Sequence, residues 1–288
     1  MAIKILENTS FTKLQLSEDG KEVISSPKDC NYIIIEEGVE IIKENAFLDC
    51  VNLRTVFLPK SIKKIEAYAF KGCVMLSRIN FPEGLNYIGV GAFSGCNRLK
   101  IVCLNSVSLI LEPAVFEKSG VEDITMYLCT YINKGLCFND ANELKNITFI
   151  KEDEELLDIF IGEAFPQGNI PVINIYKSPD ESPFSSNGVL VNTYYDDDNM
   201  PYDCVMSVPT HALEIPYGVH FLEDYCVSDD SYDDGIYRLL YIPESVDEIS
   251  DNALAHFKGV LLTPKSNTKK LEDFLSNIEN QVYGIIGV

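Results

Sequence analysis

Apolar residues recur along this chain with a fixed period of 23 residues. The pattern is clearest for four phenylalanines, and cysteines and leucines follow in the same register three and six residues later. The three series are Phe47, Phe70, Phe93 and Phe116; Cys50, Cys73 and Cys96; and Leu53, Leu76 and Leu99. A period of about 20 to 30 residues with apolar residues in fixed slots is typical of a solenoid, in which units stack because none can bury its apolar face alone.

Each unit combines an extended segment with a turn. The alternating, partly β-branched pattern of residues 53–58 predicts a strand, and Pro59 predicts its end because proline cannot donate to a strand ladder. Residues 66–69 are rich in helix formers, which predicts about one helical turn before the phenylalanine. Gly72 and Gly95 would allow the chain to reverse after it. The predicted fold class is therefore a β-rich repeat solenoid with short helical turns.

The same unit returns near the C-terminus. A proline precedes an apolar anchor by 11 residues in four places, at Pro59 and Phe70, Pro82 and Phe93, Pro216 and Val227, and Pro243 and Leu254. We therefore predict a single solenoid over residues 1–288 with β-hairpins inserted in it. Its predicted parts are an N-terminal capping hairpin at 1–31, repeats at 32–176, an inserted hairpin at 177–212, repeats at 213–262 and a C-terminal cap at 263–288.

Three further features are predicted: an anchor residue, a last strand and a helix. Phe138 is the predicted anchor of the unit that follows Phe116, and residues 260–262 are the predicted last strand. Beyond them, Leu271, Phe274, Leu275 and Ile278 share one face at helical spacing. This spacing predicts an amphipathic helix over 268–278 that caps the final coil.

The charge of the chain disfavours several kinds of partner. Acidic residues number 44 and basic residues 23, which gives a formal net charge of −21. Nucleic acids and anionic membrane surfaces both attract basic patches, so neither is expected as a partner. The sequence shows no signal-peptide pattern and no apolar run of about 18 residues. The residues alone therefore predict no membrane insertion, a cytoplasmic location by default, and a monomer.

Candidate chemistry is sparse. Residues 229–235 are rich in the oxygen ligands that suit Ca²⁺, but Tyr241 stands where an EF-hand loop needs a glutamate. The three histidines, His211, His220 and His256, lack the spacing of metal ligands, and no CxxC pair offers a zinc site. The slot cysteines are expected to be small buried thiols. We predict no catalytic residue, metal site, cofactor or enzymatic activity; the alternative is a calcium-binding or enzymatic protein that uses the acidic loops.

Two consecutive segments carry a family resemblance. LRTVFLPKSIKKIEAYAFKGC at 53–73 and LSRINFPEGLNYIGVGAFSGC at 76–96 resemble the BspA-type leucine-rich-repeat family, and YIPESVDEISDNAL at 241–254 is similar again. The resemblance extends over about 32–262. It implies a curved leucine-rich-repeat solenoid without a catalytic site, and a role in protein binding. It also implies a cell-surface or secreted location, with adhesion to host components as an alternative function.

The strand face is the predicted binding surface. Side chains alternate along a strand, so the residues between core slots should face outward. The predicted protein-binding residues are Tyr32, Ile34, Thr55, Phe57, Arg78 and Asn80. The predicted function is thus a non-enzymatic protein–protein interaction module, whose acidity favours a basic partner and whose long face suits an extended one. The competing binding site is the loop at 194–202, where Tyr194 and Tyr195 precede three aspartates.

Overall fold

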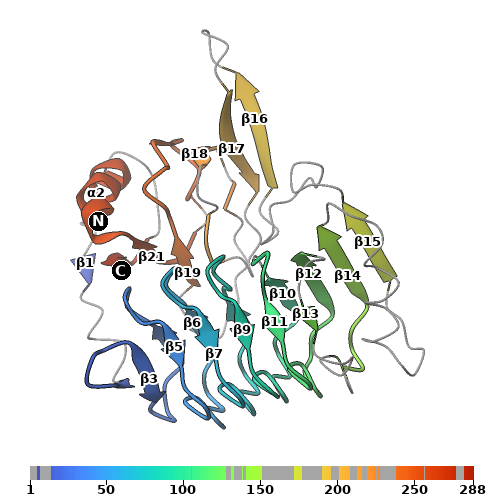
Figure 1. The fold of residues 1–288 in the computed structure, drawn as a ribbon. Coiled ribbons are helices and arrows are strands. Elements are labelled where there is room, and N and C mark those ends of the chain that lie inside the picture. Colours follow the sequence, from blue (N-terminus) through green and yellow to red (C-terminus); the bar gives the residue numbers. More distant parts are fainter. Residues whose placement is uncertain are drawn as a thin grey trace. The chain divides into compact units, whose positions relative to one another are not determined.

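The computed structural model falls into two compact units (Figure 1). The N-terminal unit is Phe11–Glu181, and the C-terminal unit combines Met1–Ser10 with Ser182–Val288. The structure describes residues 5–6, 14–104, 106–127, 131–132, 138, 141–150, 172–176, 190–195, 201–207, 213–215, 219–224, 226–227, 238–255, 257–276 and 282–288, with only the backbone at 5–6, 127, 131–132, 149–150, 172–176, 190–195 and 201–207. A single solenoid over the whole chain stays a prediction.

The N-terminal unit is a solenoid whose coils each add short parallel strands. One sheet has the order β13-β11-β9-β7-β5-β3-β2, and only its end pair, β2 and β3, is antiparallel. Its strands are β2 (Gln15–Leu16), β3 (Glu22–Ser25), β5 (Ile41–Ile42), β7 (Lys64–Ile65), β9 (Tyr87–Ile88), β11 (Ile110–Leu111) and β13 (Tyr131–Ile132). The antiparallel pair is the predicted N-terminal hairpin, and it lies at the end of this sheet (Figure 1).

Two further sheets contain the other strand of each coil. They have the orders β4-β6-β8 and β10-β12-β14-β15, and all their pairs are parallel. Their strands are β4 (Tyr32–Ile34), β6 (Thr55–Phe57), β8 (Arg78–Ile79), β10 (Ile101–Leu104), β12 (Asp123–Tyr127), β14 (Asn146–Ile150) and β15 (Val172–Tyr176). The predicted strand at 53–58 is thus confirmed as β6, one coil of the solenoid.

A stack of phenylalanine rings forms the centre of this unit. Phe47 stacks on Phe70 with 4.7 Å between ring centroids, and Phe70 on Phe93 with 5.2 Å. Phe116 and Phe138 continue the stack at 5.9 and 6.1 Å. The first two spacings are close to the roughly 4.8 Å between neighbouring parallel strands, because one ring enters per coil, and the last two are wider. The phenylalanine slot is confirmed as core, and so is Phe138 as its next anchor.

The slot cysteines bond one coil to the previous one. The thiol of Cys73 donates to the carbonyl of Phe47 at 3.1 Å, and that of Cys96 to the carbonyl of Phe70 at 3.2 Å. Both thiols are free and fully buried. Burial raises the pKa of the Cys96 thiol, so the neutral donor form is maintained. The expected ladder of buried thiols is confirmed, with a hydrogen-bonding role added to it.

The segment before each phenylalanine forms turns instead of the predicted helical turn. Alternate N–H groups of this segment donate to carbonyls of the next coil. The Asn45 N–H donates to the Ala67 carbonyl at 3.2 Å, and the Phe47 N–H to the Ala69 carbonyl at 2.8 Å. These N–H groups therefore cannot donate to carbonyls within a helix. Two residues per coil adopt a left-handed backbone to allow this. They recur every 23 residues as Asn45, Tyr68, Gly91 and Ala114, and as Asp49, Gly72, Gly95 and Lys118.

The C-terminal unit contains two four-stranded sheets. Their orders are β1-β22-β21-β19 and β16-β17-β18-β20, and the only antiparallel pair in them is β16 with β17. Their strands are β1 (Ile5–Leu6), β16 (Leu190–Tyr195), β17 (Pro201–Ser207), β18 (Val219–Leu222), β19 (Arg238–Tyr241), β20 (Glu248–Ile249), β21 (Gly259–Thr263) and β22 (Gly284–Gly287). The inserted hairpin predicted within 177–212 is confirmed as β16 and β17.

The predicted capping helix is present. A short 3-10 helix, η3 (Lys265–Asn267), leads into α2 (Thr268–Ser276). Leu271 and Leu275 are buried in one cluster with Ile249 and Leu261. The Lys270 ammonium donates to the carbonyl of Val246 at 3.0 Å. The helix therefore packs on the last coils as predicted. No helix among the described residues has the length and apolarity to cross a membrane.

The ends of the chain differ from the prediction in two respects. The last strand is β22 and not the predicted strand at 260–262, which is β21. Ile5 of β1 pairs with Ile285 of β22, so residues 1–10 join the C-terminal unit and lie outside the predicted N-terminal capping hairpin at 1–31. The hairpin itself is limited to β2 and β3.

Candidate protein-binding surface

Four of the six predicted binding residues are buried. Thr55 is 0 % exposed and Asn80 is 8 % exposed, and Ile34 and Phe57 are also buried. Only Tyr32 and Arg78 are partly exposed. The prediction that this face is exposed is therefore wrong at Ile34, Thr55, Phe57 and Asn80.

The physical reason is that both faces of the sheet are covered at its central strand, β6. All three residues of β6 are buried, whereas alternation alone would leave every second one in water. Burial on both faces is the usual state of parallel sheets. Asn80 has a reason of its own, because its side-chain amide donates to the Leu58 carbonyl at 2.8 Å and accepts from the Leu58 N–H at 2.7 Å. Asn80 therefore holds two coils together.

The sheet of two-residue strands offers a more accessible surface. One outward side chain per strand lies in register across β5, β7, β9 and β11. We call these four residues the open row; they are Ile41, Lys64, Tyr87 and Ile110. Each is at least partly exposed, whereas the second residue of each of these strands is buried. The open row is thus set by the same alternation that failed on the other sheet.

The half of the open row that contains Tyr87 and Ile110 is the more apolar one. Ile110 is 37 % exposed, and Val107 in the preceding turn is 59 % exposed. The Lys64 ammonium lies 4.8 Å from the centroid of the Tyr87 ring. Partial burial raises the pKa of Tyr87, and the nearby carboxylates of Glu112 and Glu66 raise it further. The phenol is therefore neutral and can donate a hydrogen bond to a partner.

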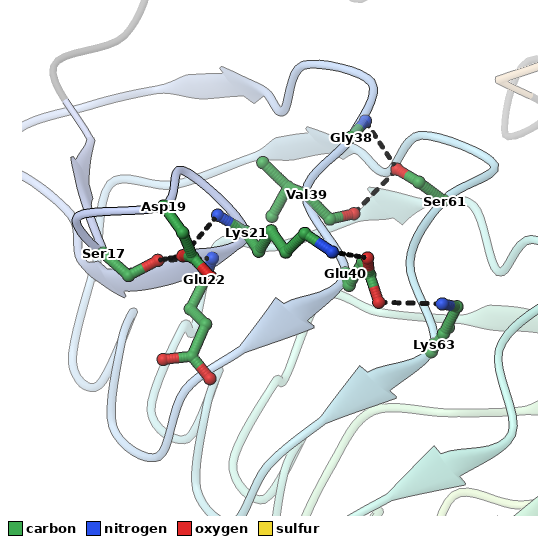
Figure 2. A network of polar contacts seen from close by, with 9 residues as sticks. All are labelled: Ser17, Asp19, Lys21, Glu22, Gly38, Val39, Glu40, Ser61 and Lys63. Atoms are coloured by element: carbon green, nitrogen blue, oxygen red, sulfur yellow. Dashed lines mark hydrogen bonds and ion pairs between the residues drawn. The ribbon is translucent and has the colours of Figure 1, made fainter.

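A second feature beside the open row is a chain of ion pairs across coils (Figure 2). The Glu40 carboxylate accepts from Lys21 at 2.8 Å and from Lys63 at 2.7 Å, so that one acid joins three neighbouring coils. Beside it, the Ser61 hydroxyl accepts from the Gly38 N–H and donates to the Val39 carbonyl. Glu122 repeats the arrangement with Lys100 and Lys145 on the other side of the unit.

The sequence analysis missed these ion pairs, although the period could have found them. Glu40 and Lys63 are 23 residues apart, as are Glu122 and Lys145, so opposite charges fall in one repeat position of adjacent coils. The two lysines bonded to each acid hold the pKa of Glu40 and of Glu122 at about 2. Both acids thus stay charged at any physiological pH.

This shift predicts how acid affects stability. The folded-state pKa of each glutamate lies below its ordinary value, so the stabilisation is complete above about pH 4.5 and is lost as the pH falls towards 2. We expect the urea midpoint of the native chain to fall between pH 6 and pH 3 by more than that of a Glu40→Gln/Glu122→Gln variant. A Glu83→Gln variant, altered at an exposed turn residue, should behave as the native chain does. Equal falls in all three chains would contradict the role of the ion pairs.

The other candidate sites are the histidines and the acidic loops. Among the described residues, no group of three or more histidine, cysteine or acidic side chains could hold a metal ion. His220 lies 3.0 Å from Asp247, which also pairs with Lys270 at 3.2 Å. His211, His256, the acidic loop at 229–235 and residues 196–200 of the competing loop lie outside the described residues.

Comparison with solved structures finds several bacterial proteins with a partial likeness to this chain. Solved structures similar to this chain include a leucine-rich-repeat protein of T. pallidum, with 25% identity, a TM-score of 0.44, and 58% of this chain and 84% of that chain covered. A leucine-rich cell-surface protein of Faecalibacterium prausnitzii A2-165 is 15% identical, with a TM-score of 0.32 over 87% of this chain and 74% of that one. The pneumococcal vaccine antigen PcpA is 16% identical, with a TM-score of 0.35 over 96% of this chain and 83% of that one.

No curated protein sequence matches the chain. The family model described as BspA type Leucine rich repeat region matches residues 20–145 in six copies. The matched residues contain the stacked phenylalanines, the cysteine slot and the open row. Residues 20–145, less than half of the chain, are thus similar to the BspA type Leucine rich repeat region.

Proposed function

We propose that this chain is a non-enzymatic protein-binding module whose partner contacts the open row. The observation that carries the proposal is the contrast between the two residues of each short strand. The inward residue is always a buried Ile or Leu, whereas the outward residues are Ile41, Lys64, Tyr87 and Ile110. A repeat scaffold can change such outward side chains without disturbing its core, which is how solenoids form extended binding surfaces.

The chemistry of the open row suits a protein ligand. Tyrosine is enriched among residues that dominate binding energy, and Tyr87 has exposed Ile110 and charged Lys64 as its neighbours in register. Aliphatic and aromatic surface at the centre with charged residues around it is the usual composition of an interface. Here the charged neighbours are Glu66 and Glu112. Tyr87 is therefore the proposed anchor.

The charge distribution favours a basic partner. Residues 128–237 contain 21 acidic and four basic residues, so most of the net charge of −21 is located in this part of the chain. Such a field speeds the approach of positively charged proteins and slows that of acidic ones. The partner proposed here is accordingly a basic protein or a basic segment of one.

The remaining sequence predictions stay predictions. They are a contact of the partner with Tyr32 and Arg78, the adhesin role with host components, and calcium binding by the acidic loops. The location of the protein stays a prediction in the same way. Each concerns a partner, an ion or a cell compartment and can be tested separately from the open row.

The test is a selection followed by a paired mutation. We would select binders to the whole chain from a displayed peptide library and measure their Kd for the native protein and for Tyr87→Ala/Ile110→Ala. We expect the double variant to bind at least about tenfold more weakly, since it removes the proposed anchor and its apolar neighbour.

A matched control separates this effect from general loss of apolar surface. Leu16→Ala/Val51→Ala also removes two exposed apolar side chains, 43 % and 47 % exposed, from the same unit. The control should bind as the native chain does. Unchanged binding by the Tyr87→Ala/Ile110→Ala variant would refute the open row as the site. If no library member binds at all, the protein-binding function itself is refuted.

A further inference from the structure

One strand of the C-terminal unit has an edge that pairs with no other strand among those that the structure describes. β16 (Leu190–Tyr195) is the end strand of the sheet β16-β17-β18-β20, and its inner edge pairs with β17. Among the strands that the structure describes, none pairs with its outer edge. Figure 1 shows β16 and β17 as the pair of long antiparallel arrows. A strand of six residues presents about three N–H and three C=O groups along such an edge.

The sequence of β16 lacks the usual protection of an edge strand. Natural edges are kept from pairing by short length, charged side chains, proline or a bulge. The opposite edge of this sheet, β20, is only two residues long and begins with Glu248. β16 is three times as long and reads LVNTYY, without a charge or a proline, and its bulge is confined to the first step between Leu190 and Val191. The outer edge beyond Val191 is therefore suited to accept another strand.

The charge around β16 indicates what kind of strand fits. Residues 178–237 contain 13 acidic residues and no lysine or arginine. Three of the acids, Asp196, Asp197 and Asp198, follow β16 directly, and Asp203 lies in β17 opposite Thr193. A second copy of this chain would bring two such acidic segments together, which like-charge repulsion opposes. A segment rich in lysine or arginine would be attracted to the same place.

We propose that the outer edge of β16 binds an extended, basic segment of a partner protein as an added strand. Main-chain hydrogen bonds along β16 provide the affinity, and the acidic composition of residues 178–237 favours a positively charged segment. The inference rests on the proposed protein-binding function and adds a docking place distinct from the open row. It also gives the acidity of residues 178–237 a role in choosing the partner.

The first test uses two synthetic peptides and the full chain. One peptide alternates lysine with threonine and valine, and the other has glutamate in place of each lysine. Hydrogen–deuterium exchange is followed residue by residue with and without each peptide. The lysine peptide is expected to slow exchange at alternate amides within 190–195, because only every second N–H of an edge strand points outward. The glutamate peptide is expected to change nothing.

Other exchange patterns would overturn the proposal. No protection at β16 refutes it, and so does protection of β15 (Val172–Tyr176), the other long uncharged edge strand, in place of β16. Changes confined to residues 196–198 indicate charge attraction without an added strand and refute it as well. Protection by the glutamate peptide equal to that by the lysine peptide refutes the selection for basic segments.

The second test uses proline to remove single N–H groups. Asn192 and Thr193 are neighbours, so one N–H points to β17 and the other to the outer edge. Asn192→Pro and Thr193→Pro each remove one of these two N–H groups. The variant in which the amides of β17 stay protected from exchange has lost the N–H group at the outer edge. That variant is expected to bind the lysine peptide about tenfold more weakly. Unchanged affinity refutes the added strand.

The outcomes also separate this inference from the proposed function. Tyr87→Ala/Ile110→Ala is expected to leave the protection of β16 by the lysine peptide unchanged. If library-selected ligands bind through the open row but no peptide protects β16, the inference fails and the proposed function stands. If no ligand of any kind binds, both fail.

Discussion

Replacing Phe70 by alanine is expected to lower the free energy of unfolding by about 3–5 kcal/mol. Phe70 is fully buried and lies in the middle of the ring stack, at 4.7 Å from Phe47 and 5.2 Å from Phe93. Alanine would leave a cavity between two rings whose backbones are tied to their own coils. Collapse of the neighbours into this space is restricted, because the Phe70 N–H donates to the Ala92 carbonyl at 2.8 Å.

The measurement is urea denaturation of the native chain and three variants. Phe70→Leu should cost less than Phe70→Ala, since leucine refills most of the volume but loses the stacking. Val51→Ala, at a residue 47 % exposed, should change the free energy of unfolding by no more than about 0.5 kcal/mol. A cost below about 1 kcal/mol for Phe70→Ala would mean that the ring stack contributes little to stability.

The repeat could be predicted from the sequence because every coil places the same slot in the same environment. Phe70 and Phe93 each have a stacked phenylalanine ring in the coil before and in the coil after, so the same side chain is suitable each time. The two-residue strands also followed from local alternation, since Ile65 and Ile88 face the core while Lys64 and Tyr87 do not. The local sequence pattern is sufficient to predict burial wherever a residue's neighbours come from the next coil.

Burial of the second face of a sheet could not be predicted in this way. Alternation states that Phe57 and Val56 face opposite sides of β6, and the structure buries both sides. What lies over a sheet depends on residues far away in the chain, which a local pattern does not describe. The pairing of β1 with β22 is a similar case, because Ile5 and Ile285 stand at opposite ends of the sequence. Neither β1, with two residues, nor β22, with four, has a periodic signal of its own.

The open row and the edge of β16 could be predicted in part from the sequence. The period places Ile41, Lys64, Tyr87 and Ile110 in one repeat position, which identifies a row once the strands are known. The hairpin at β16 and β17 was predicted, but its position at the end of a sheet depends on the pairing of β17 with β18. The missing information in each case is which surface stays exposed after the coils have stacked.

Asn80 provides the sharpest test between a binding residue and a structural one. It was predicted to contact a partner, yet its amide is bonded to both backbone groups of Leu58, at 2.7 and 2.8 Å, in a buried position. β8 ends at Ile79, so the side chain of Asn80 takes the place of ladder bonds that the backbone no longer makes there. Asn80→Ala would leave the N–H and the C=O of Leu58 buried without these partners.

We expect Asn80→Ala to lower the free energy of unfolding by about 2–4 kcal/mol, because each buried backbone group that loses its partner costs about 1–3 kcal/mol. Asn86→Ala, at an exposed asparagine of the same coil, should cost no more than about 0.5 kcal/mol. Both are measured by urea denaturation, together with the Kd of a library-selected ligand. The folded fraction of Asn80→Ala should bind that ligand as the native chain does. If Asn80→Ala instead unfolds like the native chain but binds more weakly, Asn80 acts as the binding residue that the alternation of β8 predicted.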